Sequence, residues 1–258
     1  MTYSLPNIKP EFLFFDPMPE EQTSKKLEDE VFYPSSDGKP MAENTRQYDV
    51  IVMIKENLEI LFPENVFIAA DLFWYPVKGD NKTKLAPDTM VAIGRPKGFR
   101  LSYLQWKENN IPPQVVFEVL SHGNTKDEMK KKLRFYEQYG VQEYYEIEPY
   151  KNEIKVWTRI GNKLVPVNHS GKWTSPLLEI KFDLSNKKLE FFGPDSKPFI
   201  TTIELDKQFR KTKAELLHKG VLLEMEKQKA ENEKQRANQA EEKLKILESR
   251  LKELGMTL

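Results

Sequence analysis

The sequence predicts an α/β (α+β) fold in which a mixed central sheet is flanked by helices and followed by a long C-terminal helix or coiled coil. Three observations indicate this class. Short β-like apolar runs alternate with stretches of helical periodicity through the middle of the chain. Hydrophobic residues make up 39% of the chain and aromatic residues 11%, which is enough for a packed core. Near residue 205 the composition changes, and residues 224–254 are dominated by Glu, Lys, Gln, Ala and Leu.

Composition divides the chain into three parts. Residues 1–42 are rich in Pro, Ser and charged side chains, and we expect an irregular N-terminal arm. Residues 43–204 carry the periodic segments and form the expected folded domain. Residues 205–258 form the expected helix or coiled coil.

The elements of the expected domain follow one another closely. A helix is predicted over residues 45–62, because its apolar side chains fall on one face and Pro63 ends it. A second helix is predicted over residues 126–139, stopped by Gly140. We expect both helices to pack on one sheet formed by residues 66–75, 88–94, 114–120 and 143–148. Further strand-like runs, separated by turn residues, lie at 153–160, 163–167, 178–184 and 188–192.

Composition also excludes several kinds of protein. The chain has no Cys, which excludes disulfides, zinc–thiolate sites and thiol nucleophiles and fits a reducing, cytoplasmic location. We expect no membrane span, since no apolar run approaches the roughly 20 residues required. The N-terminus lacks the pattern of a secretory signal. The formal net charge is zero, which leaves nucleic-acid binding open because a local basic patch can bind phosphates.

The C-terminal segment carries a heptad pattern. Leucines and alanines recur every seven residues in two series offset by three. The first series is Leu223, Ala230, Ala237, Leu244 and Leu251, and the second is Ala240, Leu247 and Leu254. This pattern is typical of a coiled coil, so we expect a homodimer. The alternative is a single solvated helix, because Glu226 and Glu233 occupy positions where a coiled coil prefers apolar residues.

Glu118 is the most informative polar residue. It lies within VVFEVL (115–120), where both alternating faces are apolar, so the strand is predicted to be central and covered on both sides. A carboxylate in such a place is costly unless it is paired, protonated or bound to a metal. The alternative to a functional role is a glutamate at a strand end, paired with a Lys or Arg.

Asp88 provides a second carboxylate. It follows Pro87 at the entrance of the predicted strand at 88–94, although Asp is also common in turns before strands. Two neighbouring strands that each present a carboxylate can hold one hard cation, such as Mg²⁺ or Mn²⁺. Such an ion can generate hydroxide from water and stabilise the charge that develops on a phosphodiester.

Helical geometry selects one lysine from the run at 130–132. At about 100° per residue, Lys132 falls within the apolar arc of its helix, whereas Lys130 and Lys131 fall outside it. That arc is defined by Met129, Leu133, Phe135, Tyr136 and Tyr139. Lys132 is therefore predicted to point towards the sheet as a candidate electrostatic catalyst. The alternative is an amphipathic lysine whose ammonium reaches solvent.

Three further sets of residues are candidates for weaker reasons. Glu43 falls on the buried face of the first helix if that helix begins early, but it also suits a capping acid. Asp71 lies in an apolar run, and we favour a structural role for it. Just after the Asp88 strand, GRPKGFR (94–100) presents three cations suited to phosphate contacts, or forms an ordinary solvated loop. These cations are Arg95, Lys97 and Arg100.

Several of these segments resemble the Uma-type endonuclease family of the PD-(D/E)XK nuclease superfamily. The resemblance covers roughly residues 39–160. It rests on PD at 87–88, FEVLS at 117–121 and KLRFYEQYGVQEYYEIEP at 132–149, together with KPMAENTRQY (39–48), WYPVKG (74–79) and GRPKG (94–98). The sequence departs from the family pattern at His122, where Pro is usual, and at Glu148, where Asp is usual.

The resemblance implies a restriction-endonuclease-like sheet and a set of site residues. Asp88 and Glu118 match the acidic positions, and the glutamate of the first helix corresponds to Glu43. The position that carries Lys in the general superfamily motif is Leu120 here, and in this family the lysine comes from the following helix, at Lys132.

We therefore expect a Mg²⁺- or Mn²⁺-dependent DNA endonuclease. Asp88 and Glu118 would hold the metal, Lys132 would be the electrostatic helper, and Glu43 would be an additional catalytic residue. The alternative is a catalytically inactive nuclease-like module that assembles partners through its C-terminal coiled coil.

Overall fold

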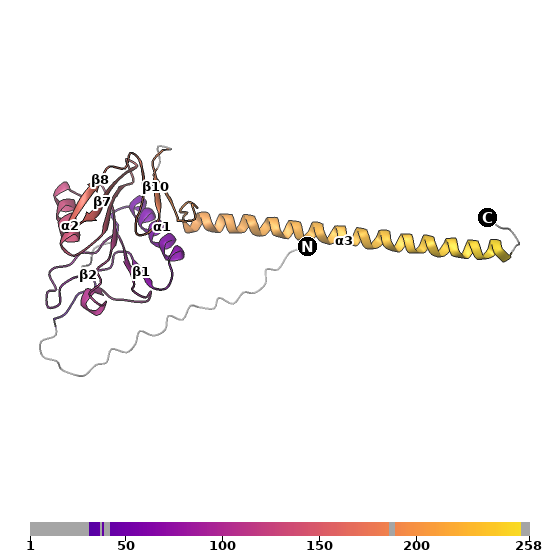
Figure 1. The fold of residues 1–258 in the computed structure, drawn as a ribbon, viewed down its shortest axis with the longest axis horizontal. Coiled ribbons are helices and arrows are strands. Elements are labelled where there is room, and N and C mark those ends of the chain that lie inside the picture. Colours follow the sequence, from indigo (N-terminus) through magenta and orange to yellow (C-terminus); the bar gives the residue numbers. More distant parts are fainter. Residues whose placement is uncertain (1–30, 37, 39–41, 186–188, 254–258) are drawn as a thin grey trace, which may run out of the picture.

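A six-stranded sheet forms the centre of the computed structural model, which describes residues 31–36, 38, 42–185 and 189–253 (Figure 1). Most of the expected N-terminal arm lies outside these residues. The strand order is β1-β3-β5-β6-β7-β8. The strands are β1 (Val66–Ala69), β3 (Thr89–Ile93), β5 (Val115–Val119), β6 (Glu143–Glu148), β7 (Glu153–Ile160) and β8 (Lys163–Val167). Strands β5 and β6 pair in parallel and the other neighbours are antiparallel, so the predicted mixed sheet is confirmed.

Two smaller sheets flank the central one. The first has the order β11-β10-β9, formed by β9 (Lys172–Thr174), β10 (Lys181–Asp183) and β11 (Glu190–Phe192). The second is a short parallel pair of β2 (Trp74–Tyr75) and β4 (Tyr103–Leu104), and a 3₁₀ turn at Gln105–Lys107 follows it. The aromatic side chains of β2 and β4 are fully buried, so this pair contributes to the core despite its length.

Two helices pack against the central sheet, as predicted, and they cover its opposite faces. Helix α1 (Thr45–Leu61) begins at Asn44, whose side chain accepts a hydrogen bond from the Gln47 amide. Helix α2 (Lys126–Gln138) begins at Thr125, which accepts from the Glu128 amide in the same way. Beyond α2, Gly140 adopts a φ of +97°, the left-handed conformation that commonly ends a helix.

The alternation of side chains along β5 places Glu118 on the α2 side of the sheet. Val115, Phe117 and Val119 pack in the core beneath α1, whereas Val116 packs in the core beneath α2. Because successive side chains point to opposite faces, Glu118 shares the α2 face with Val116. The prediction that this strand is covered on both faces is therefore confirmed.

The expected strand at 66–75 is wrong in its second half. Strand β1 ends at Ala69, and Asp71 adopts a left-handed φ of +50° while its amide donates to the Pro87 carbonyl. This bend moves Trp74 and Tyr75 out of the central sheet into the β2–β4 pair. The runs at 178–184 and 188–192 form strands over only part of their lengths, and β9 was not predicted.

Helix α3 (Thr202–Glu253) projects away from the rest of the protein, as Figure 1 shows. Its 52 residues span about 78 Å at 1.5 Å per residue. The side chains from Thr202 to Arg250 are all exposed. Among the described residues, no helix carries an apolar stretch that is long enough to cross a membrane.

Candidate active site

Asp88 and Glu118 meet across two neighbouring strands of the central sheet. The antiparallel register of β3 and β5 pairs Thr89 with Phe117, so the next residues outward, Asp88 and Glu118, lie opposite each other. Side chains at opposite positions of antiparallel strands lie on the same face with their Cβ atoms about 5 Å apart. The site thus forms where β3 begins and β5 nears its end.

The backbone amide and carbonyl of Val119, the residue after Glu118, are both held by side chains from neighbouring elements. The Val119 amide donates to Asp88 Oδ2 at 2.6 Å, and the Val119 carbonyl accepts from Gln47 Nε2 of α1 at 2.8 Å. Gln47 is buried, and its Oε1 accepts from the Glu43 amide at 2.9 Å. Sequence reasoning missed Gln47, although its spacing of four from Ile51 places it on the apolar face of α1.

Glu118 is buried, with 1% of its surface exposed, and it receives two donors from α2. Lys132 Nζ donates to Glu118 Oε2 at 2.7 Å, and the Tyr136 hydroxyl donates to Glu118 Oε1. Lys132 and Tyr136 are four residues apart, so one face of the helix presents both. The predicted inward orientation of Lys132 is therefore confirmed, while Lys131 is exposed.

The charges in this cluster influence one another strongly. Burial raises the pKa of Asp88 well above its usual range, the negative charge of Glu118 adds to this effect, and Lys132 partly opposes it. Burial lowers the pKa of Lys132, but the charges of Glu118 and Asp88 outweigh it, so that this pKa lies above its ordinary value. Burial and Glu118 raise the pKa of Tyr136, which keeps its hydroxyl protonated as a donor.

A cavity of about 390 Å³ opens above this cluster. Acidic side chains outnumber lysines in its wall: Glu43, Asp71, Asp88 and Glu128 against Lys84 and Lys132. Glu118 lies beneath the cavity rather than in its wall. Asp88 and Lys132 are thus the two members of the cluster that a molecule or ion bound in the cavity would contact.

Glu43 lines the same cavity but is exposed and lies in the bend before Asn44; because α1 begins only at Thr45, the expected place for Glu43 on the buried face of the first helix is wrong. Its carboxylate packs against Gly123, where an added Cβ would stand 2.6 Å from Glu43 Oε1. Within the described part of the chain, no three or more His, Asp and Glu side chains gather closely enough to hold a metal ion. The candidate acids are therefore the pair Asp88 and Glu118, with Glu43 at the margin.

Asp71 and the basic loop residues have other contacts. Asp71 lines the cavity from the bend after β1. Arg95 and Arg100 each donate to Glu108 at 2.7 Å, with their side chains 15% and 13% exposed. Lys97 donates to the carbonyls of Glu59 and Phe62 at the end of α1. None of these three cations lines the cavity, and their contacts favour a structural role over the predicted contact with phosphate.

Comparison with known proteins identifies the family. The family model Uma2, described as "Putative restriction endonuclease", matches residues 15–186. The chain belongs to the Uma2 family. Asp88, Glu118 and Lys132 of this Uma2 protein all lie within the matched region. A crystal structure of a "putative nuclease belonging to DUF820" from Anabaena variabilis ATCC 29413 is similar at a TM-score of 0.41 and 16% identity, covering 55% of this chain and 77% of that one. A search of the curated proteins found no match.

Proposed function

We propose that this Uma2 protein is a metal-dependent endonuclease that hydrolyses phosphodiester bonds of DNA. The observation that carries the proposal is the cluster of Asp88, Glu118 and Lys132 beneath a polar cavity. Membership of a family described as restriction endonucleases supports the choice of DNA as substrate.

The residues present fit a hard divalent cation, Mg²⁺ or Mn²⁺. Mg²⁺ is usually bound by one or two carboxylates, with water and phosphate oxygens completing its shell. Asp88 and Glu118 supply two carboxylates. Burial, and after it the negative charge of Glu118, raises the pKa of Asp88, and a cation would offset both effects. When bound, such an ion lowers the pKa of a water molecule and stabilises charge on the phosphate.

Each side chain of the cluster has a role that follows from its position. Asp88 faces the cavity and would hold the cation together with Glu118. Lys132 lines the cavity and donates to Glu118, so its ammonium would lie where a phosphate oxygen or the attacking water arrives. Tyr136 orients Glu118 from inside the core and is a positioning residue.

Helix α3 supports a further proposal about partners, namely that two copies of the chain pair along it. Upstream of Leu223, the seven-residue series continues through Leu216 and Phe209, whose side chains are 65% and 64% exposed. A parallel or antiparallel coiled coil would bury this stripe.

A cleavage assay tests the proposed activity. The purified full chain would be incubated with supercoiled, linear and branched DNA in Mg²⁺, in Mn²⁺ and in a chelator. We expect nicked or linear products that depend on the cation. A Glu118→Gln variant, purified in parallel, controls for contaminating nucleases, because it keeps the shape of the side chain and removes its charge. If the folded wild-type protein cuts no DNA with either cation, the inactive assembly module becomes the better explanation.

A further inference from the structure

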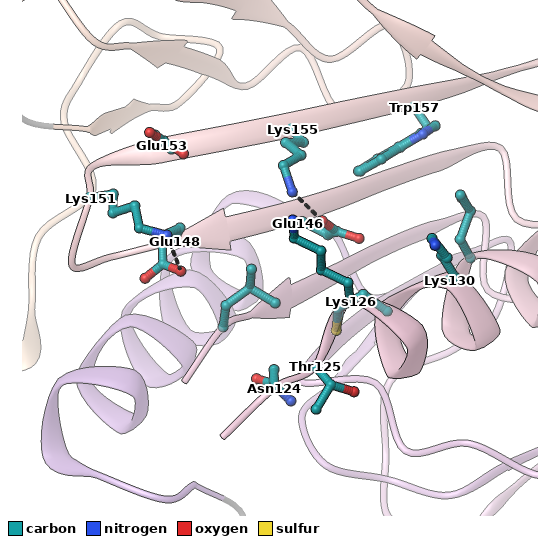
Figure 2. Close-up of a pocket in the computed structure, with 13 residues that line it drawn as sticks. Asn124, Thr125, Lys126, Lys130, Glu146, Glu148, Lys151, Glu153, Lys155 and Trp157 are labelled. Atoms are coloured by element: carbon teal, nitrogen blue, oxygen red, sulfur yellow. Dashed lines mark hydrogen bonds and ion pairs between the residues drawn. The ribbon is translucent and has the colours of Figure 1, made fainter. Parts of the chain in front are cut away.

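A second cavity lies on the other side of α2 from the site. This groove has a volume of about 400 Å³ and runs between α2 and the face of strands β6 and β7 (Figure 2). Glu128 and Lys132 line the active-site cavity, whereas Lys126, Met129 and Lys130 line the groove. Asn124 lines both, so the two cavities adjoin around the start of α2.

The floor of the groove is built by alternate residues of two paired strands. The register places Tyr144 opposite Trp157 and Glu146 opposite Lys155. Trp157 stacks on Tyr144, with the ring centroids 5.0 Å apart, and it remains partly exposed where it lines the groove. Leu120 and Leu133 also line the groove, so apolar side chains lie beside the ring of Trp157.

The charges around the groove differ from those of the active-site cavity. Four lysines and three glutamates line the groove, and two of the glutamates lie in ion pairs of 3.1 and 3.7 Å with Lys155 and Lys151. Lys126 and Lys130 of α2 are exposed at the opposite wall, and Figure 2 shows Lys126 extending from the helix across the groove. Lys130 has one weak contact, 3.6 Å from exposed Asp127.

A substrate strand needs cations that the active-site cavity does not supply. Its wall carries four acids against two lysines, and Arg95, Lys97 and Arg100 are held in contacts elsewhere. Lys126 and Lys130 line the adjoining groove, and they are the cations that we assign to the phosphates flanking the cleaved bond. An aromatic ring beside basic side chains is the combination that binds an unpaired nucleotide, because the base stacks while its phosphates are neutralised.

We infer that the groove binds an unpaired nucleotide next to the cleaved phosphate, with its base on Trp157 and its phosphates on Lys126 and Lys130. The inference rests on the proposed nuclease activity and adds a substrate class: DNA with a single-stranded segment at the cut site. A base in an intact duplex is already stacked and paired, so it would leave the ring of Trp157 uncovered.

Binding without turnover tests this inference separately from cleavage. A short, labelled single-stranded oligonucleotide and its blunt duplex would be titrated with the full chain in chelator over a range of salt concentrations. We expect the single strand to bind about tenfold more tightly than the duplex. A plot of log K against log salt has a negative slope, to which each phosphate neutralised by a lysine on a single strand contributes about −0.7. The double variant Lys126→Ala/Lys130→Ala should therefore make this slope shallower by about 1.4. The matched control is Lys131→Ala/Arg134→Ala, which removes two cations from the outer face of the same helix and should leave the slope unchanged.

Substitutions of Trp157 test the stacking of the base separately from the phosphate contacts. Trp157→Ala should weaken binding of the single strand about tenfold, as expected for loss of one stacked base. Trp157→Phe keeps an aromatic ring on Tyr144, so it should retain most of the affinity but lose most of the tryptophan fluorescence quenching that accompanies binding.

Three results would overturn the inference while leaving the proposed activity intact. The first is equal affinity for the single strand and the duplex. The second is an equal salt dependence of binding in the two double variants, and the third is undiminished quenching of tryptophan fluorescence in Trp157→Phe. Each counts against the inference when the protein still cuts DNA. Absence of both binding and cleavage would instead refute the proposed activity itself.

Discussion

Lys132→Ala removes the ammonium that lies 2.7 Å from Glu118 in a site where the two side chains are only 17% and 2% exposed. The substitution has two separable consequences. The cavity loses a positive charge from its wall, and the carboxylate of Glu118 keeps the Tyr136 hydroxyl but loses its ion pair.

The expected magnitudes follow from that burial. Removal of one preorganised electrostatic interaction lowers cleavage about a hundredfold, equivalent to about 2.7 kcal/mol in the barrier. Removing one partner of a buried ion pair costs about 3 kcal/mol of folding stability in the absence of a cation. Added Mg²⁺ should recover part of this stability, because a cation would again offset the charges of Asp88 and Glu118.

The matched control is Lys131→Ala, one residue earlier on the exposed side of α2. Single-turnover cleavage at saturating Mg²⁺ and urea unfolding with and without Mg²⁺ would be measured for both variants. Equal cleavage by the two variants would remove Lys132 from the mechanism. A stability loss in Lys132→Ala that Mg²⁺ leaves unchanged would argue against a cation at this site.

Other changes probe the surrounding residues. Asp88→Asn should abolish cleavage but raise the stability of the metal-free protein at about pH 7. Because the pKa of Asp88 is raised in the folded protein, wild-type stability falls as the pH increases from about 4 through that pKa. The greater stability of the variant in urea unfolding should therefore vanish near about pH 3, where Asp88 is protonated in both states. Glu43→Gln should reduce single-turnover cleavage by less than about tenfold, because its carboxylate lies to one side of the pair; a hundredfold loss would make it a metal ligand. Arg95→Ala should lower the free energy of unfolding in urea by about 1–3 kcal/mol and leave DNA affinity unchanged, because the partner of Arg95 is buried Glu108. Weaker DNA binding by a variant that stays stable would instead support the phosphate contact predicted from the sequence. Truncation after residue 205 should convert a dimer into a monomer in sedimentation, and identical masses for both chains would exclude pairing through α3.

The central fold could be predicted because its signals are local. The apolar periodicity of residues 45–62 and the covered strand around Glu118 each arise from side chains that are close in sequence. The bend at Asp71 gives no such signal, since it depends on a hydrogen bond to Pro87, which lies sixteen residues later. The short β2–β4 pair depends likewise on tertiary contacts.

The candidate site was predictable where one element decides the geometry. The position of Lys132 follows from the turn of its own helix, and the ion pair with Glu118 agrees with it. The basic loop shows the opposite case. Arg95 and Arg100 look available to phosphate in the sequence, but both bind Glu108, and nothing in the spacing of these residues indicates that a single acid would bind both.

The backbone of Val119 ties the two carboxylate-bearing strands to α1. Its amide donates to Asp88 at the entrance of β3 and its carbonyl accepts from Gln47 of α1, so this one residue of β5 links both strands to the helix. Lys132 reaches Glu118 from α2, which covers the face of the sheet that α1 leaves free. If phosphate and cation enter the site together, these backbone links would keep Asp88 beside β5 while the ammonium of Lys132 meets the phosphate.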